Sequence, residues 1–289
     1  MGGGSYSYSN SSSRARSLAN NSREAIFSNR MMSADMNIHG KVRESCDSDE
    51  HPESFPIIIG FDVTGSMGFV PELLIKGVFP EVMKNIMANG INHAQVCFVA
   101  FGDTYSDDAP IQVGQFETSD ELQDKWLKSS YLESGGGGNG GESANLVHFF
   151  AARCTKIDSF KKRGIKGILI TISDERTHSS ISKIDAETLF GIKIETNQIA
   201  TSEILKEASE SWNIYHVNIQ DYSSLRQNAL KQWEELLGKD NVFNVDEDNV
   251  KNQLGEILAT IIAKESTINT TSIGTVSSVE VDSNDNHLL

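Results

Sequence analysis

One apolar run, from Phe55 to Phe61, constrains the fold of this chain more than any other stretch of its sequence. It is rich in β-branched residues and ends abruptly at a charged residue, Asp62. A continuous apolar run this short is typical of a strand that is buried on both faces, as in a parallel sheet. We therefore predict that the chain is built around a buried strand at this position.

Three side chains that carry hard oxygen atoms follow this strand at alternate positions: Asp62, Thr64 and Ser66. Open α/β sheets bind ligands at the carboxyl ends of their strands, and oxygen donors suit Mg²⁺ or Mn²⁺ better than Zn²⁺. All three residue types are also good helix N-caps, so capping alone is the alternative interpretation. One cap needs one residue, and three in a single turn favour a metal site.

Strands and helices alternate along the following 210 residues or so. Further buried strands are predicted at residues 94–101, 167–173, 214–219 and 242–245. The segment 111–116 follows a short hairpin and alternates in polarity, so it should run antiparallel at an edge. We expect an α/β fold: a doubly wound, mostly parallel central sheet with one antiparallel edge strand and helices on both faces, of the Rossmann-like type.

The sequence divides into three parts. Residues 1–54 are dense in Ser, Asn, Gly and Arg and are expected to form a flexible N-terminal extension. Its apolar segments, residues 25–27 and 31–32, would either pack on the domain or bind a partner. Residues 55–265 form the predicted domain, and residues 266–289 are expected to be a flexible tail.

Composition argues against some classes of partner and indicates a cellular compartment. The chain has 289 residues and a formal net charge of −15, which argues against nucleic acid and anionic membranes as partners. No apolar stretch approaches the twenty residues of a membrane span, and the first residues lack the apolar core of a secretory signal. Three scattered cysteines indicate a reducing compartment, so we expect a cytoplasmic protein.

Two other loops should reach the edge of the sheet where Asp62 lies. Asp174 follows the strand at 167–173, and a glycine-rich loop at 135–143 contains Asn139, Glu142 and Ser143. Parallel strands bring their carboxyl ends to one edge, so these loops should meet Asp62 there. The acids of the hairpin should stand nearby: Asp103, Asp107 and Asp108.

This arrangement resembles the von Willebrand factor A family, whose metal-ion-dependent adhesion site uses an Asp-x-Ser/Thr-x-Ser motif. Asp62, Thr64 and Ser66 match that motif, and Asp174 matches the later Asp of the family. The resemblance covers about residues 55–265.

The second loop of the family usually supplies a Thr, and this chain departs from that pattern. Its loop resembles the Gly-Gly-Gly-Asp-x-Pro-Glu-Ser of many bacterial members, with Asn139 and a glycine in place of Asp and Pro. Asn139, Glu142, Ser143 or water would then complete the metal shell.

The resemblance implies a divalent-metal-dependent protein-binding module rather than an enzyme. Thr64 and Ser66 would hold Mg²⁺ (or Mn²⁺) directly, and Asp62 and Asp174 would hold its waters. An acidic side chain of a partner protein would complete the coordination of the ion. Bacterial relatives suggest an adaptor for an ATPase-containing assembly.

Other interpretations stay open. Asp62 would be a nucleophile in an aspartyl-phosphate enzyme, with Lys166 or Lys183 neutralising the phosphoryl group. The glycine-rich loop would bind phosphate, although it lacks the Gly-Lys-Ser/Thr ending of a P-loop. The chain would otherwise be a scaffold with a vestigial metal site. His148 and His216 are isolated in the sequence and are interpreted as packing residues rather than ligands.

Overall fold

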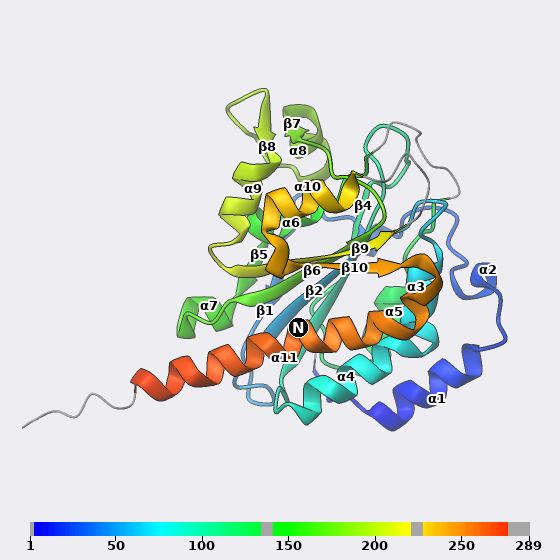
Figure 1. Ribbon diagram of the computed structural model, residues 1–289, viewed down its shortest axis with the longest axis vertical. Helices are drawn as coiled ribbons and strands as arrows, with labels where there is room; N and C mark the ends of the chain where they lie inside the picture. The colour runs from blue at the N-terminus through cyan, green and yellow to red at the C-terminus, as the bar shows by residue number, and fades with distance from the viewer. Residues whose placement is uncertain (1–2, 134–140, 221–227, 277–289) are drawn as a thin grey trace, which may run out of the picture.

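The computed structural model describes residues 3–133, 141–220 and 228–276, and a six-stranded sheet lies at its centre (Figure 1). The strand order is β10-β9-β6-β2-β3-β4. The bounds are β2 Phe55–Asp62, β3 Ala94–Phe101, β4 Ile111–Val113, β6 Gly167–Ser173, β9 Trp212–Gln220 and β10 Val242–Asp246. Neighbouring strands are parallel except β4, which runs antiparallel to β3.

The predicted strand at Phe55 is confirmed as the buried centre of this sheet. Every residue of β2 is buried, because strands pair with it on both sides and helices cover both faces. Alternate residues enter different cores: Ile57 and Ile59 belong to one apolar cluster, and Ile58 belongs to the other. This explains why the strand reads as a continuous apolar run rather than as an alternating one.

Helices form a layer on each face of the sheet (Figure 1). One layer contains α1 Tyr8–Leu18, α3 Phe69–Leu73, the π-helical η2 Leu74–Val78, α4 Phe79–Ala88, α5 Asp120–Lys128 and α11 Val250–Val276. The other contains α6 Asn145–Arg153, α8 Lys183–Phe190, α9 Thr201–Ala208 and α10 Ala229–Leu237. Short helical segments lie at α2 Arg23–Ile26, η1 Ala34–Met36, α7 Asp158–Arg163, η3 Lys239–Asn241 and η4 Glu247–Asn249.

Two small sheets accompany the central one, and the expected fold class needs correction. β1 Arg43–Ser45 pairs in parallel with β5 Thr155–Ile157, and β7 Ser180–Ser182 pairs antiparallel with β8 Gln198–Ala200. The architecture is a mixed six-stranded sheet with two accessory sheets, and it is not clearly a doubly wound, Rossmann-like fold. The sequence could not reveal these accessory pairs, because each strand has only three residues and pairs with a distant segment.

The N-terminal segment differs from the flexible extension that was expected. It packs on the domain through α1, and it buries Ile26, Phe27, Met36 and Ile38. Of its two apolar segments, the first packs in the core, whereas Met31 is 74% exposed. Burial of these side chains supplies the ordering free energy that composition alone does not reveal.

The expected tail boundary at residue 266 also changes, since α11 continues to Val276. Residues 277–289 lie outside the described part of the chain. Within the described residues, no helix combines the length and the apolar character needed to cross a membrane.

Candidate functional site: an acidic edge of the sheet

The loops after β2, β3 and β6 meet at the carboxyl edge of the central sheet. Asp62 is the last residue of β2 and is completely buried. Its Oδ1 accepts hydrogen bonds from the backbone N–H of Thr64 at 2.8 Å and from the Thr64 hydroxyl at 2.7 Å. This local Asp–Thr turn is typical of a short acidic side chain that ends a strand, and it fixes the direction of the Asp62 carboxyl group.

The second oxygen of Asp62 is buried and has no hydrogen-bond partner among the described residues. Burial, and after it the negative charge of Asp174, raise the pKa of Asp62 to about 8, although the bonds from Thr64 oppose this rise. Asp174 follows the end of β6, which pairs in parallel with β2, so the structure places Asp62 and Asp174 at the same edge of the sheet. In the absence of a positively charged ligand, the Asp62 carboxyl group holds its proton at neutral pH.

Glu142 is a second buried acid at this edge. Its backbone N–H donates to the Arg176 carbonyl at 2.8 Å, and its carbonyl accepts from the His178 N–H at 3.2 Å. These bonds join the end of the glycine-rich loop to the segment after β6. Burial raises the pKa of the Glu142 side chain to about 10, with added contributions from the charges of Asp62 and Asp103. Its Oε2 is buried without a hydrogen-bond partner in the described part of the chain.

Ser143 connects the same loop to the β3 hairpin. Its hydroxyl accepts a hydrogen bond from the Thr104 N–H at 3.0 Å, and its own N–H donates to the Gly102 carbonyl at 2.9 Å. Ser66, in contrast, is exposed, and its side chain makes no hydrogen bond with any described residue. Asn139 lies outside the described residues.

His178 is a functional candidate that sequence reasoning missed. Its Nε2 lies 2.7 Å from Oδ1 of Asp103, and its ring meets Tyr105 edge to face at a centroid distance of 4.9 Å. His178 belongs to a stretch whose apolar residues follow neither a helical nor a strand period, so the sequence carried no signal for it. Its position beside Asp103 depends on the loop after β6 folding back over the hairpin.

The structure does not support the expected metal-binding adhesion site as a preformed cluster of ligands. Among the residues described, no group of three or more His, Cys, Asp or Glu side chains is arranged to hold a metal ion. The hydroxyl of Thr64 points to Asp62, and that of Ser143 is bonded to the β3 hairpin. Both hydroxyls are engaged in internal hydrogen bonds, which is a structural role that the motif alone cannot distinguish from metal ligation.

Lys166, one candidate partner for an aspartyl phosphate, lies at the opposite edge of the sheet. It precedes β6, whereas Asp62 ends the parallel strand β2. Its ammonium group donates to the Ser209 carbonyl at 2.6 Å. Lys166 therefore cannot neutralise a phosphoryl group on Asp62.

Comparison with known proteins gives a fold likeness without a family assignment. No family model and no curated protein matches the chain. Among solved structures, the pilus adhesin SpaC from Lactobacillus rhamnosus GG in its open conformation has a TM-score of 0.52 and 14% identity, over 78% of this chain and 31% of that chain. A second structure of the same adhesin gives a TM-score of 0.50, 14% identity and coverage of 78% and 32%.

A minor pilin, PilB of Streptococcus sanguinis, has a TM-score of 0.45 and 11% identity, over 76% of this chain and 63% of that chain. Of the pilus adhesin SpaC, by comparison, this chain spans about a third of the length.

These findings correct four expectations from the sequence. The assignment to the von Willebrand factor A family has no matching family model, and the two solved structures with TM-scores of 0.52 and 0.50 are described as a pilus adhesin. The predictions of a metal-dependent adaptor and of a cytoplasmic location are contradicted by the same neighbours. The predicted metal site has no cluster of three or more His, Cys, Asp or Glu side chains among the described residues. The cysteines that suggested a reducing compartment are free thiols, and free thiols alone do not locate a protein.

Proposed function

We propose that this chain is a binding domain of a surface-adhesion protein, and that it contacts its ligand through the acidic edge formed by the loops after β2, β3 and β6. The observation that carries the proposal is the pair of unpaired buried oxygens at this edge, Oδ2 of Asp62 and Oε2 of Glu142. The fold likeness to a pilus adhesin supports a role outside the cell.

Without a ligand, two buried oxygen atoms of this edge have no hydrogen-bond partner among the described residues. A buried polar group left without a hydrogen bond costs about 1–3 kcal/mol. A ligand that brings a positive charge or N–H donors to Asp62 and Glu142 recovers this cost, and a positive charge also favours release of the protons that these two carboxyl groups hold in its absence. Mg²⁺ (or Mn²⁺) and an acidic side chain of a partner protein remain proposals for the same edge.

Surface labelling and adhesion test the proposal together. Antibody against the domain should label intact cells of the source organism, and beads coated with the purified domain should adhere to an immobilised lysine-rich peptide, which brings positive charge and N–H donors to the acidic edge. Glu142→Gln should reduce this adhesion, whereas Glu121→Gln, at an exposed position of α5, should not. Labelling only after permeabilisation, or equal adhesion by the two variants, would overturn the proposal.

The cation is tested separately by thermal melting with Mg²⁺, with Mn²⁺ and with chelator. An ion that binds only the folded protein raises the melting midpoint by mass action. An unchanged midpoint at millimolar Mg²⁺ and Mn²⁺ would eliminate the ion and leave direct contact between the acidic edge and the ligand.

A further inference from the structure

A cavity of about 620 Å³ opens at the amino end of β9, on the edge of the sheet opposite to the acidic edge. Residues of β9, of α9 and α10 on one face, and of α11 on the other face line it. Its volume lies within the range of about 300–1,000 Å³ that is typical of ligand sites.

The floor of this cavity is a strand edge. β10 pairs with β9 only from His216 onward. The first four residues of β9, Trp212 to Tyr215, pair with β6 on one side and, within the described residues, with no strand on the other. A strand edge without a neighbour is a template on which an extended segment can pair through its backbone.

Three lysines line the same cavity: Lys166, Lys206 and Lys264. None of them has an ion-pair partner in the part of the chain that the structure describes. The ammonium group of Lys264 lies 5.2 Å from the centre of the Tyr215 ring. This concentration of positive charge stands out in a protein whose formal net charge is −15.

The lining contains one acid, Glu265, against three lysines, so its formal net charge is +2. Glu265 is buried, and its carboxylate accepts hydrogen bonds from the Tyr215 hydroxyl and, at 2.5 Å, from the Asn213 side-chain amide. Glu265 therefore holds the side chains of β9 in place, and the lysines leave the cavity with an excess of positive charge for a ligand.

We propose that this cavity binds an extended acidic peptide segment of a partner protein, which pairs with Trp212–Tyr215 as an added strand and places its carboxylates against the lysines. Strand pairing supplies backbone hydrogen bonds, and the lysines select acidic side chains over basic ones. The site is independent of the acidic edge, because it lies at the amino ends of parallel strands whose carboxyl ends form that edge.

The test uses the full chain and three probes: a capped hexapeptide of alternating Val and Glu, a capped hexapeptide of alternating Val and Lys, and inorganic phosphate. Calorimetry should show binding of the Val-Glu peptide only. Hydrogen exchange should then show slower exchange of the backbone amides in the segment 212–215.

Lys206→Gln and Lys264→Gln should each weaken binding about two- to fivefold, and the double variant about tenfold, as expected for exposed charge pairs. Lys193→Gln is the matched control, because Lys193 is 82% exposed and lies outside the cavity lining. Melting curves check that each variant is folded. Equal binding of the Val-Lys peptide, competition by phosphate without amide protection, or no binding of the Val-Glu peptide would each overturn the proposal.

Discussion

At the scale of single residues, the carboxyl group of Asp62 keeps its proton to a much higher pH in the folded protein than in the unfolded chain. Its pKa rises from 3.8 to about 8 on folding. The stability that it contributes is therefore complete below about pH 4 and is lost as the pH rises toward 8. Asp62→Asn does not titrate and keeps an oxygen to accept the two bonds from Thr64.

As the pH rises from 5 to 8, the free energy of unfolding of the parent should fall by about 3 kcal/mol relative to that of Asp62→Asn. The size follows because a tenfold change in proton affinity is worth about 1.4 kcal/mol. Urea denaturation of both proteins at several pH values measures this difference. Parallel pH profiles for parent and variant would contradict a raised pKa at Asp62.

His148 has the opposite dependence on pH. Both of its ring nitrogens are buried without hydrogen-bond partners among the described residues, and burial lowers its pKa from 6.5 to about 3. It packs edge to face against Trp233, on which the ring of His216 stacks at 3.8 Å. The interpretation of both histidines as packing residues agrees with this complete burial.

A buried neutral histidine contributes stability that is present above about pH 6.5 and is lost as the pH falls toward 3. As the pH falls from 6.5 to 4.5, the free energy of unfolding should therefore decrease by about 2 kcal/mol less in His148→Leu than in the parent. The same substitution at the exposed His39 is the control, and it should leave the acid dependence of the parent unchanged. Equal acid sensitivity of parent and His148→Leu would show that His148 does not limit stability in acid.

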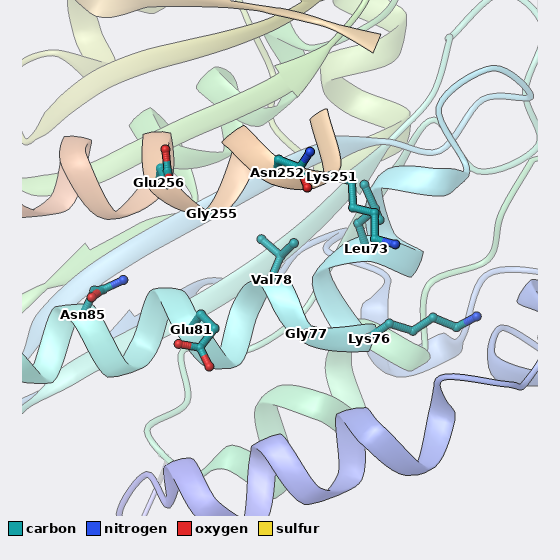
Figure 2. Close-up of a pocket in the computed structure, with 10 residues that line it drawn as sticks. All are labelled: Leu73, Lys76, Gly77, Val78, Glu81, Asn85, Lys251, Asn252, Gly255 and Glu256. Atoms are coloured by element: carbon teal, nitrogen blue, oxygen red, sulfur yellow. The ribbon is translucent and has the colours of Figure 1, made fainter. Parts of the chain in front are cut away.

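At the scale of secondary-structure elements, a groove of about 330 Å³ lies between α11 on one side and η2 and α4 on the other (Figure 2). Two glycines line it, Gly77 and Gly255, and Figure 2 shows Val78 pointing toward α11. A methyl group added at Gly255 would meet only Val78, at 3.6 Å, and one added at Gly77 would meet nothing within 4 Å. Space therefore does not distinguish the two positions, but backbone geometry does, because φ is +155° at Gly77.

This difference predicts opposite effects of the same substitution. Gly255→Ala should stabilise the protein by about 0.5–1 kcal/mol, since alanine restricts the unfolded chain and suits a helix interior. Gly77→Ala should destabilise it by about 1–3 kcal/mol, because an L-residue is strained at that φ. Chemical denaturation of the two variants measures both effects. Equal signs would show that packing in the groove, rather than backbone strain, controls stability there.

The elements also show how far the sequence could predict the structure. The strands predicted at 94–101 and 167–173 agree with β3 and β6, because each is a continuous apolar run. The helical segment after β2 breaks at Gly77, whose φ and ψ are not helical, and Pro80 occupies the first turn of α4, where proline is tolerated.

Around the candidate site, strand topology was enough to place the loops that follow strands, and it placed Asp62 and Asp174 at the same edge of the sheet. The segment 176–197 could not be placed in this way, because β7 and α8 there are short and pack mainly through distant partners. His178 was missed for the same reason. The engagement of the Thr64 and Ser143 hydroxyls was also beyond the sequence, since the first donates to the Asp62 carboxylate and the second accepts from the Thr104 N–H.

At the scale of the whole molecule, the sequence failed where folding depends on contacts between distant segments. β1 lies in a charged stretch that showed no strand pattern, and its Arg43 is buried because the guanidinium donates to the carbonyls of Asp35 and Val113, at 2.7 Å and 3.0 Å. Arg14 of α1 likewise binds Asp120 and Asp124 of α5, each at 2.5 Å. These contacts tie the first 54 residues to the domain, although their composition is typical of an extension.

If that N-terminal segment is part of one cooperative unit, a substitution within it must lower the stability of the whole molecule. Phe27 is 5% exposed and belongs to the same apolar cluster as Ile57 of β2. Phe27→Ala should cost about 3–5 kcal/mol in the free energy of unfolding, as large-to-small core substitutions do. The loss should appear in a single transition followed by circular dichroism, which reports mainly on the central sheet and its helices. Met31→Ala, in the second apolar segment and 74% exposed, should change stability by less than about 0.5 kcal/mol. A separate early transition in Phe27→Ala, with the main unfolding unchanged, would show that residues 1–54 fold as an independent unit.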